Sequence, residues 1–455
     1  EQLLNLASVL LNTYTIYKDH ESKKAVCDIY DEMITIDGSF IAIFLDHIVE
    51  TLGDKIGTKA LSDYLNLLDN INHFLQVILV DSNLTSQYLP KVLQCHTITT
   101  ASIETSLDIS EKSMELVSEK QNQHRRRMRK TIIQNSTKYL NKGLKNTENI
   151  QDVLETIRHQ LLEEYVKLKL PVAGILVFSA ALTKAALQLH VQTPIVLEFL
   201  RTTYSKDFVV FFGKEVLLGK TPPSSLCVAT SIDTISQELF TEDMIKNDII
   251  PVLEKSNLRS PESSFQYARA LFGSINAKTI NMAELYASTK LMSQAFSSFK
   301  SSREGTKTAA ISFTVSVLRS LCVETTEESA LLKIVENIFT NLKTNMNADY
   351  KAIVSTLLQA IPTFHENVSL DIAEKLSPLL VKESNEQALV NLLNPFYQHY
   401  FATGTSIDKF NTTIISGLQE KKAPLKRCWF SSLFMNIDTV TESIAKTIGK
   451  LCTTY

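Results

Sequence analysis

The stretch TEDMIKNDIIPVLEKSNL, residues 241–258, indicates how the second half of the chain folds. Its apolar side chains recur at the spacing of one helix face: Ile245, Ile249, Val252 and Leu253. Residues 259–261 interrupt the pattern with a proline, and a second amphipathic helix follows at residues 262–272. The segment therefore predicts two consecutive helices joined by a short turn.

The same pair of helices recurs four more times along the chain. The first helices begin near residues 243, 283, 329, 369 and 406. Their spacing of roughly 37 to 46 residues is close to the length of a two-helix HEAT unit. Pro251 and Pro378 occupy the same place in two first helices, three repeats apart, where an internal proline bends a helix. Because stacked pairs bury their apolar stripes in one continuous core, the pattern predicts an all-α, armadillo/HEAT-type α-solenoid superhelix.

The first half of the chain is also helical but less regular. Residues 62–80 and 150–169 have the pattern of amphipathic helices, whereas residues 100–123 are polar and predict a loose loop or an extended helix. We expect an irregular HEAT-like array over residues 1–240. Regular HEAT repeats over residues 241–455 would continue it.

Composition supports a helical protein. The chain has 12 glycines and 11 prolines in 455 residues, well below the usual ~7% and ~5%, and a β-sandwich or α/β enzyme needs more turn residues. The net charge of -3 excludes a general polyanion binder. Six scattered cysteines predict reduced thiols and a cytoplasmic location. The chain begins and ends inside helical patterns, so we expect a fragment of a longer protein.

One apolar segment raises the question of a membrane. Residues 170–183 are uncharged, and Lys169 and Lys184 bracket them. A spanning helix needs about 20 apolar residues, so this segment predicts a buried core helix instead, and we expect no membrane contact.

Residues 208–221 have some features of a nucleotide-binding loop. An apolar run precedes Gly213, and Gly219, Lys220 and Thr221 follow. Five residues separate the two glycines where the loop allows four, and the prolines at 222–223 offer no N–H to a phosphate. We expect an apolar helix that ends at Gly219, with the prolines beginning the next helix.

The sequence shows no arrangement of residues for catalysis. The nine histidines are scattered, and the six that lie in predicted helices are expected to be buried with satisfied hydrogen bonds or exposed, not to be metal ligands. Hydrolase, zinc-protease and kinase signatures do not occur. We therefore expect no enzymatic activity, no catalytic or metal-binding residues, no cofactor and no small-molecule substrate.

The run KQNQHRRRMRK, residues 120–130, is the most basic stretch of the chain and contains no acid. Arginine recognises phosphate through paired hydrogen bonds. The run predicts a contact with RNA or an acidic protein at Arg125, Arg126, Arg127, Arg129 and Lys130. The alternative is a solvated helix face whose charges balance Glu111, Glu115 and Glu119. A weaker basic patch consists of Lys421, Lys422, Lys426 and Arg427.

Eight segments together carry a resemblance to a known family: residues 10–19, 63–72, 120–129, 213–227, 258–262, 297–302, 347–351 and 421–430. They resemble the fungal general-control translational activators, which are very large HEAT-repeat proteins. The resemblance runs from end to end and places this chain in the N-terminal part of the family. It implies the HEAT-repeat fold that the period also predicts.

The resemblance implies a role in the amino-acid starvation response. The family associates with translating or stalled ribosomes and works with an ABC-type partner ATPase. It relays the uncharged-tRNA signal to the starvation kinase that phosphorylates the alpha subunit of translation initiation factor two. The family's kinase-binding and elongation-factor-like segments lie elsewhere in its sequence. We therefore expect a non-enzymatic scaffold that engages the ribosome and supports kinase activation.

Two other classes of function compete with this interpretation. A karyopherin-like solenoid would carry protein cargo, but such chains are usually more acidic than this near-neutral chain with its basic run. An NTPase would rest on residues 213–221 alone, where the spacing does not fit.

Overall fold

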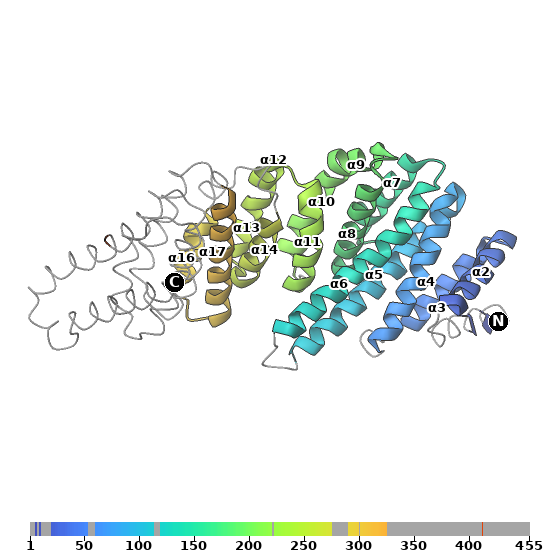
Figure 1. Ribbon diagram of the computed structural model, residues 1–455, viewed down its shortest axis with the longest axis horizontal. Coiled ribbons are helices and arrows are strands. Elements are labelled where there is room, and N and C mark those ends of the chain that lie inside the picture. The colour runs from blue at the N-terminus through green and yellow to red at the C-terminus, as the bar shows by residue number, and fades with distance from the viewer. Residues whose placement is uncertain are drawn as a thin grey trace, which may run out of the picture. The chain divides into compact units, whose positions relative to one another are not determined.

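Figure 1 shows the computed structural model. The structure describes residues 5–6, 9–10, 20–52, 60–112, 119–220, 223–274, 290–299, 301–324 and 412. Every regular element within these residues is a helix, which confirms the predicted all-α class. The chain divides into two compact units, Glu1–Leu253 and Glu254–Tyr455. The predicted halves, residues 1–240 and 241–455, and their continuity stay a prediction.

The described part of the first unit is a stack of helices. It begins with α2 (His20–Ile36), α3 (Ser39–Leu52), α4 (Leu61–Val80), α5 (Ser82–Lys112) and α6 (Glu119–Lys145). It continues with α7 (Ile150–Arg158), η1 (His159–Glu163), α8 (Val172–Leu189), α9 (Pro194–Phe199), η2 (Leu200–Tyr204), α10 (Ser205–Phe211), η3 (Phe212–Leu217), α11 (Ser225–Leu239), α12 (Glu242–Met244) and η4 (Ile245–Ile249). The η segments are π-helical.

Helices α4, α6, α8 and α11 pack against one another in that order, and α5 packs against both α4 and α8 (Figure 1). Each helix therefore contacts partners from neighbouring pairs. This stacking is that of an all-α, HEAT-like solenoid.

Helix α8 forms the centre of this unit. It is mostly apolar and long enough by composition to cross a membrane, but 72% of it is buried inside the protein. At Gly174 a Cβ would lie 2.2 Å from the backbone oxygen of Thr97, so α8 approaches α5 closely there. The burial confirms the core helix predicted over residues 170–183.

The segment that resembles a nucleotide loop is helical. Helix α10 continues into η3, which ends at Leu217, and α11 begins at Ser225. A Cβ on Gly219 would lie 2.0 Å from the carbonyl oxygen of Glu215, so only glycine fits where this helix ends. The predicted apolar helix is confirmed, but it ends at Leu217, two residues before Gly219, and Pro223 lies outside α11, which does not begin with the prolines.

Two histidines in this unit are buried in contrasting surroundings. His73 lies 2.9 Å from the carboxylate of Asp31. Burial disfavours its protonation, but hydrogen bonds with Asp31 and Cys27 outweigh burial and raise its pKa to about 9. The ring of His96 lies 3.0 Å from the hydroxyl of Ser136 on α6 and faces no charge among the contacts described. Burial lowers its pKa to about 3.

In the second unit, helices α14 (Pro261–Ser274) and α16 (Leu291–Ser298) both pack against α17 (Glu304–Glu324). The rings of Phe265 and Phe272 each lie 5.8 Å from Phe313. These helices confirm the second helix of the first pair and, where described, both helices of the second pair. The later predicted pairs lie outside the described residues.

The first predicted helix of the repeat is also present. Helix α12, η4 and α13 (Ile250–Asn257) follow one another without a break. Pro251 is the second residue of α13, two positions after the π-helical segment ends, and the wider turn before it accommodates a residue that cannot donate a backbone hydrogen bond. Residues 100–112, for which the sequence left a loose loop or an extended helix open, are helical, because α5 continues through them.

Candidate nucleic-acid interface on α6

The basic run predicted at residues 120–130 lies in the first three turns of α6. The helical period divides it between two faces. Arg125 and Arg129, four residues apart, point inward and are 6% and 2% exposed. Arg126, Arg127 and Lys130 are exposed to solvent. The structure therefore brings only three of the five predicted contact residues to the surface.

The inward arginines contribute to the packing of α6. Arg129 Nε donates to Glu104 Oε2 on α5 at 2.6 Å, and the two side chains are 2% and 5% exposed. A buried carboxylate requires such a partner, because an uncompensated charge in the core costs several kcal/mol. Arg125, one turn earlier, lies on the same buried face. These two residues are structural and are not accessible to a phosphate.

The outward face of α6 carries basic residues from Arg127 to Lys145, well beyond the predicted run. Its exposed side chains recur every three or four residues: Arg127, Lys130, Gln134, Lys138, Lys142 and Lys145. We call this row the α6 crest. No acidic residue follows Glu119 on the helix. The last three lysines were not predicted as contact residues from the sequence, although their helical spacing after Lys130 was a usable signal.

A polar groove of about 450 Å³ lies beside the crest, between α6 and α8. Its lining consists of lysine, amide and threonine side chains: Gln134, Thr137, Lys138, Asn141, Lys142, Lys184 and Gln188. Lys184 is the only charged residue of α8. Asn141 donates to the amide oxygen of Gln188 at 3.3 Å across the groove. The groove therefore has three cations and no acid, a composition suited to an anion.

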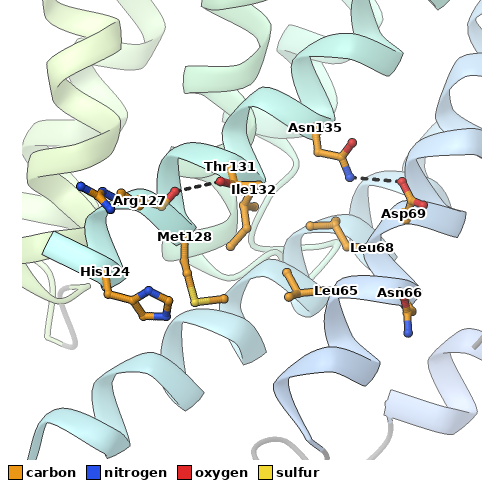
Figure 2. A pocket seen from close by; sticks show the side chains of 10 residues that line it. All are labelled: Leu65, Asn66, Leu68, Asp69, His124, Arg127, Met128, Thr131, Ile132 and Asn135. Carbon is orange, nitrogen blue, oxygen red and sulfur yellow. Dashed lines mark hydrogen bonds between the residues drawn. The ribbon is translucent and has the colours of Figure 1, made fainter. Parts of the chain in front are cut away.

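A second groove, of about 430 Å³, lies on the other side of α6, toward α4. Figure 2 shows apolar side chains in it, among them Leu65, Leu68 and Met128, with Arg127 and His124 beside them. The carboxylate of Asp69 accepts hydrogen bonds from Asn135 and from the hydroxyl of Tyr139, each at 3.1 Å. Burial and this carboxylate raise the pKa of Tyr139. The carboxylate of Asp69 therefore already accepts hydrogen bonds from other side chains of the protein.

The remaining candidates add nothing to this interface. The weaker patch of Lys421, Lys422, Lys426 and Arg427 lies outside the described residues. Within the part of the chain that the structure describes, no group of three or more His, Cys, Asp or Glu side chains could hold a metal ion. What the described surface offers is an extended cationic face.

Comparison with known proteins identifies the family. Residues 205–348 match the family model "Stalled ribosome sensor GCN1 N-terminal", and residues 348–455 match "General control nonderepressible 1 (Gcn1) N-terminal". A protein of Saccharomyces cerevisiae named "eIF-2-alpha kinase activator GCN1" is 38% identical over 443 residues, covering 97% of this chain. The chain spans 16% of that protein's length.

A solved structure described as a "Circular tandem repeat protein with novel repeat topology and enhanced subunit contact surfaces" covers 99% of this chain and 96% of its own, at 12% identity and a TM-score of 0.25. That score is too low to bear on the fold, which follows from the helix packing. The two adjoining family matches and the alignment along nearly the whole chain confirm the resemblance: the chain belongs to the Gcn1 family, within the region that the family's N-terminal models describe.

Proposed function

We propose that this chain is a non-enzymatic scaffold, an arm of a translational activator that binds the ribosome in the cytoplasm. In this role it supports activation of the starvation kinase that phosphorylates initiation factor two alpha. Kinase and ABC-type ATPase partners would act through the full-length protein. The names of the matching family model and of the yeast relative support this proposal.

The observation that carries the proposal is the outward face of α6. Arg126, Arg127 and Lys130 are exposed on a helix without acidic residues beyond its first position. A ribosome presents a dense negative surface, and unpaired cations attract such a surface over several ångströms. A karyopherin-like cargo carrier, the alternative function, would call for an acidic surface, which this helix does not offer.

Co-sedimentation of the 455-residue chain with purified ribosomes, across a salt series, tests the proposal. We expect binding at low salt that weakens steeply as salt rises, because cations that contact phosphates release condensed counterions. Binding that is absent at low salt would contradict the proposal. Binding that does not respond to salt would exclude phosphate contacts and indicate an apolar docking surface instead.

A further inference from the structure

The α6 crest is long enough to follow an extended ligand. It runs from Arg127 to Lys145, which corresponds to roughly 27 Å of helix at a rise of 1.5 Å per residue. Successive crest positions lie about one turn apart, and five of the six are cations. A ligand that matches this surface has negative charges repeated along a line.

The crest cations lack the carboxylate partners found elsewhere in the first unit. Lys91 pairs with Asp46 at 2.9 Å, and Arg201 pairs with Glu238 at 3.0 Å. Among the described residues, no ion pair involves a crest cation or Lys184. Among the described residues, therefore, no ion pair compensates the field of the crest, and binding a polyanion would neutralise it.

The side chains in the adjoining groove favour a nucleic-acid backbone over an acidic peptide. Protein partners usually place an aromatic or aliphatic anchor in an apolar pocket, and none of the seven groove residues is apolar. Amides such as those of Gln134 and Gln188 hydrogen-bond phosphate and sugar oxygens, and lysine binds phosphate as a point charge. Such contacts position a backbone without reading its sequence.

We propose that the α6 crest and the α6–α8 groove form a track for the phosphate backbone of RNA, with Lys138, Lys142 and Lys184 as its principal contacts. This inference rests on the proposed ribosome-binding role and names the ligand of that site. It moves the centre of the contact from the arginine run to the C-terminal half of α6, where the crest and the groove meet.

The test is fluorescence anisotropy of a labelled RNA stem–loop titrated with the full chain. We compare wild type with Lys138→Glu/Lys142→Glu and with Lys24→Glu/Lys206→Glu, a control of equal charge change on α2 and α10. We expect at least tenfold weaker binding for the first variant and unchanged binding for the control. The slope of log K against log salt should fall by about two, one unit for each lost phosphate contact. Unaltered melting curves by circular dichroism establish that both variants fold.

Two results would overturn the inference. One is equal RNA binding by the crest variant and its control, or no RNA binding at low salt. The other is displacement of the RNA by polyglutamate at matched charge concentration, which would indicate an acidic protein ligand. The ribosome assay separates this inference from the proposed function. If Lys138→Glu/Lys142→Glu leaves ribosome affinity unchanged, only the RNA track is rejected. If the chain binds RNA but not ribosomes, only the ribosomal role is rejected.

Discussion

The inner and outer faces of α6 both carry arginines near the start of the helix, but the inner arginines are buried and the outer ones are exposed to solvent. Arg129 is buried against Glu104 of α5, while Arg127, two positions earlier, is exposed beside an open groove. Helix geometry separates them, because residues four apart share a face and residues two apart do not. A basic run in a helix is therefore divided into a buried set and an exposed set of side chains, and only the exposed set can bind a ligand.

The largest expected effect comes from breaking the inner face. Arg129→Met removes the guanidinium that donates to the buried carboxylate of Glu104, so we expect the free energy of unfolding to fall by about 3–5 kcal/mol. Urea unfolding followed by circular dichroism measures this. Arg129→Met/Glu104→Leu removes both charges and should recover much of the loss. A single variant as stable as wild type would show that the pair is dispensable.

Substitutions on the outer face of α6 should have little effect on stability. Arg126→Glu/Arg127→Glu/Lys130→Glu replaces only exposed side chains, so we expect the free energy of unfolding to change by no more than ~0.5 kcal/mol. The same urea series measures it. A loss comparable to that of Arg129→Met would mean that these side chains also hold the helix in place, and the division between the faces would fail.

The inner face is also expected to be sensitive to acid. His96 packs on Ser136 of α6, and its pKa is lowered to about 3 by burial. The unfolded chain therefore binds a proton below pH 6.5 that the folded chain does not. Stability should fall by roughly 1 kcal/mol between pH 6.5 and pH 5.5 from this residue.

The variant His96→Gln keeps a polar partner for Ser136 and removes the titration. Thermal unfolding at a series of pH values should show a flatter acid limb for this variant than for wild type. Identical pH profiles for the two proteins would show that His96 does not govern the acid response.

A modest effect concerns a buried histidine that has a charged partner. Hydrogen bonds with Asp31 and Cys27 raise the pKa of His73 to about 9 despite its burial. Its contribution to stability is complete below pH 6.5 and is lost as the pH rises through about 9. Because Asp31 is half exposed, Asp31→Asn should cost less than ~1 kcal/mol at pH 6 and nothing at pH 10. An equal cost at both pH values would contradict this assignment.

The sequence predicted the class of fold and the existence of the basic surface. Apolar periodicity identified α8 as a core helix and α12 to α14 as one helical pair, because burial of an apolar stripe is a local property of the pattern. The spacing of the two glycines and the prolines that follow them excluded a nucleotide loop near Gly219. These conclusions needed no knowledge of neighbouring helices.

The division of the arginine run was harder to predict. Glu104, the partner of Arg129, lies 25 residues earlier in the chain. Only the packing of the helices shows that α5 covers this face of α6. The positions of Ile132, Ile133 and Leu140 do mark the buried side and place Arg129 on it. Lys184 could not be linked to the crest from sequence, because α8 and α6 meet only in the fold.

The most direct test of the central claim is ribosome co-sedimentation of Arg126→Glu/Arg127→Glu/Lys130→Glu beside a charge-matched control, Lys24→Glu/Lys206→Glu/Lys255→Glu. Both variants change net charge equally, and the control residues are exposed on other helices. We predict that the α6 variant loses at least tenfold in ribosome affinity at low salt while the control binds as wild type does. Equal binding by both variants would contradict the claim that the outward face of α6 contacts the ribosome.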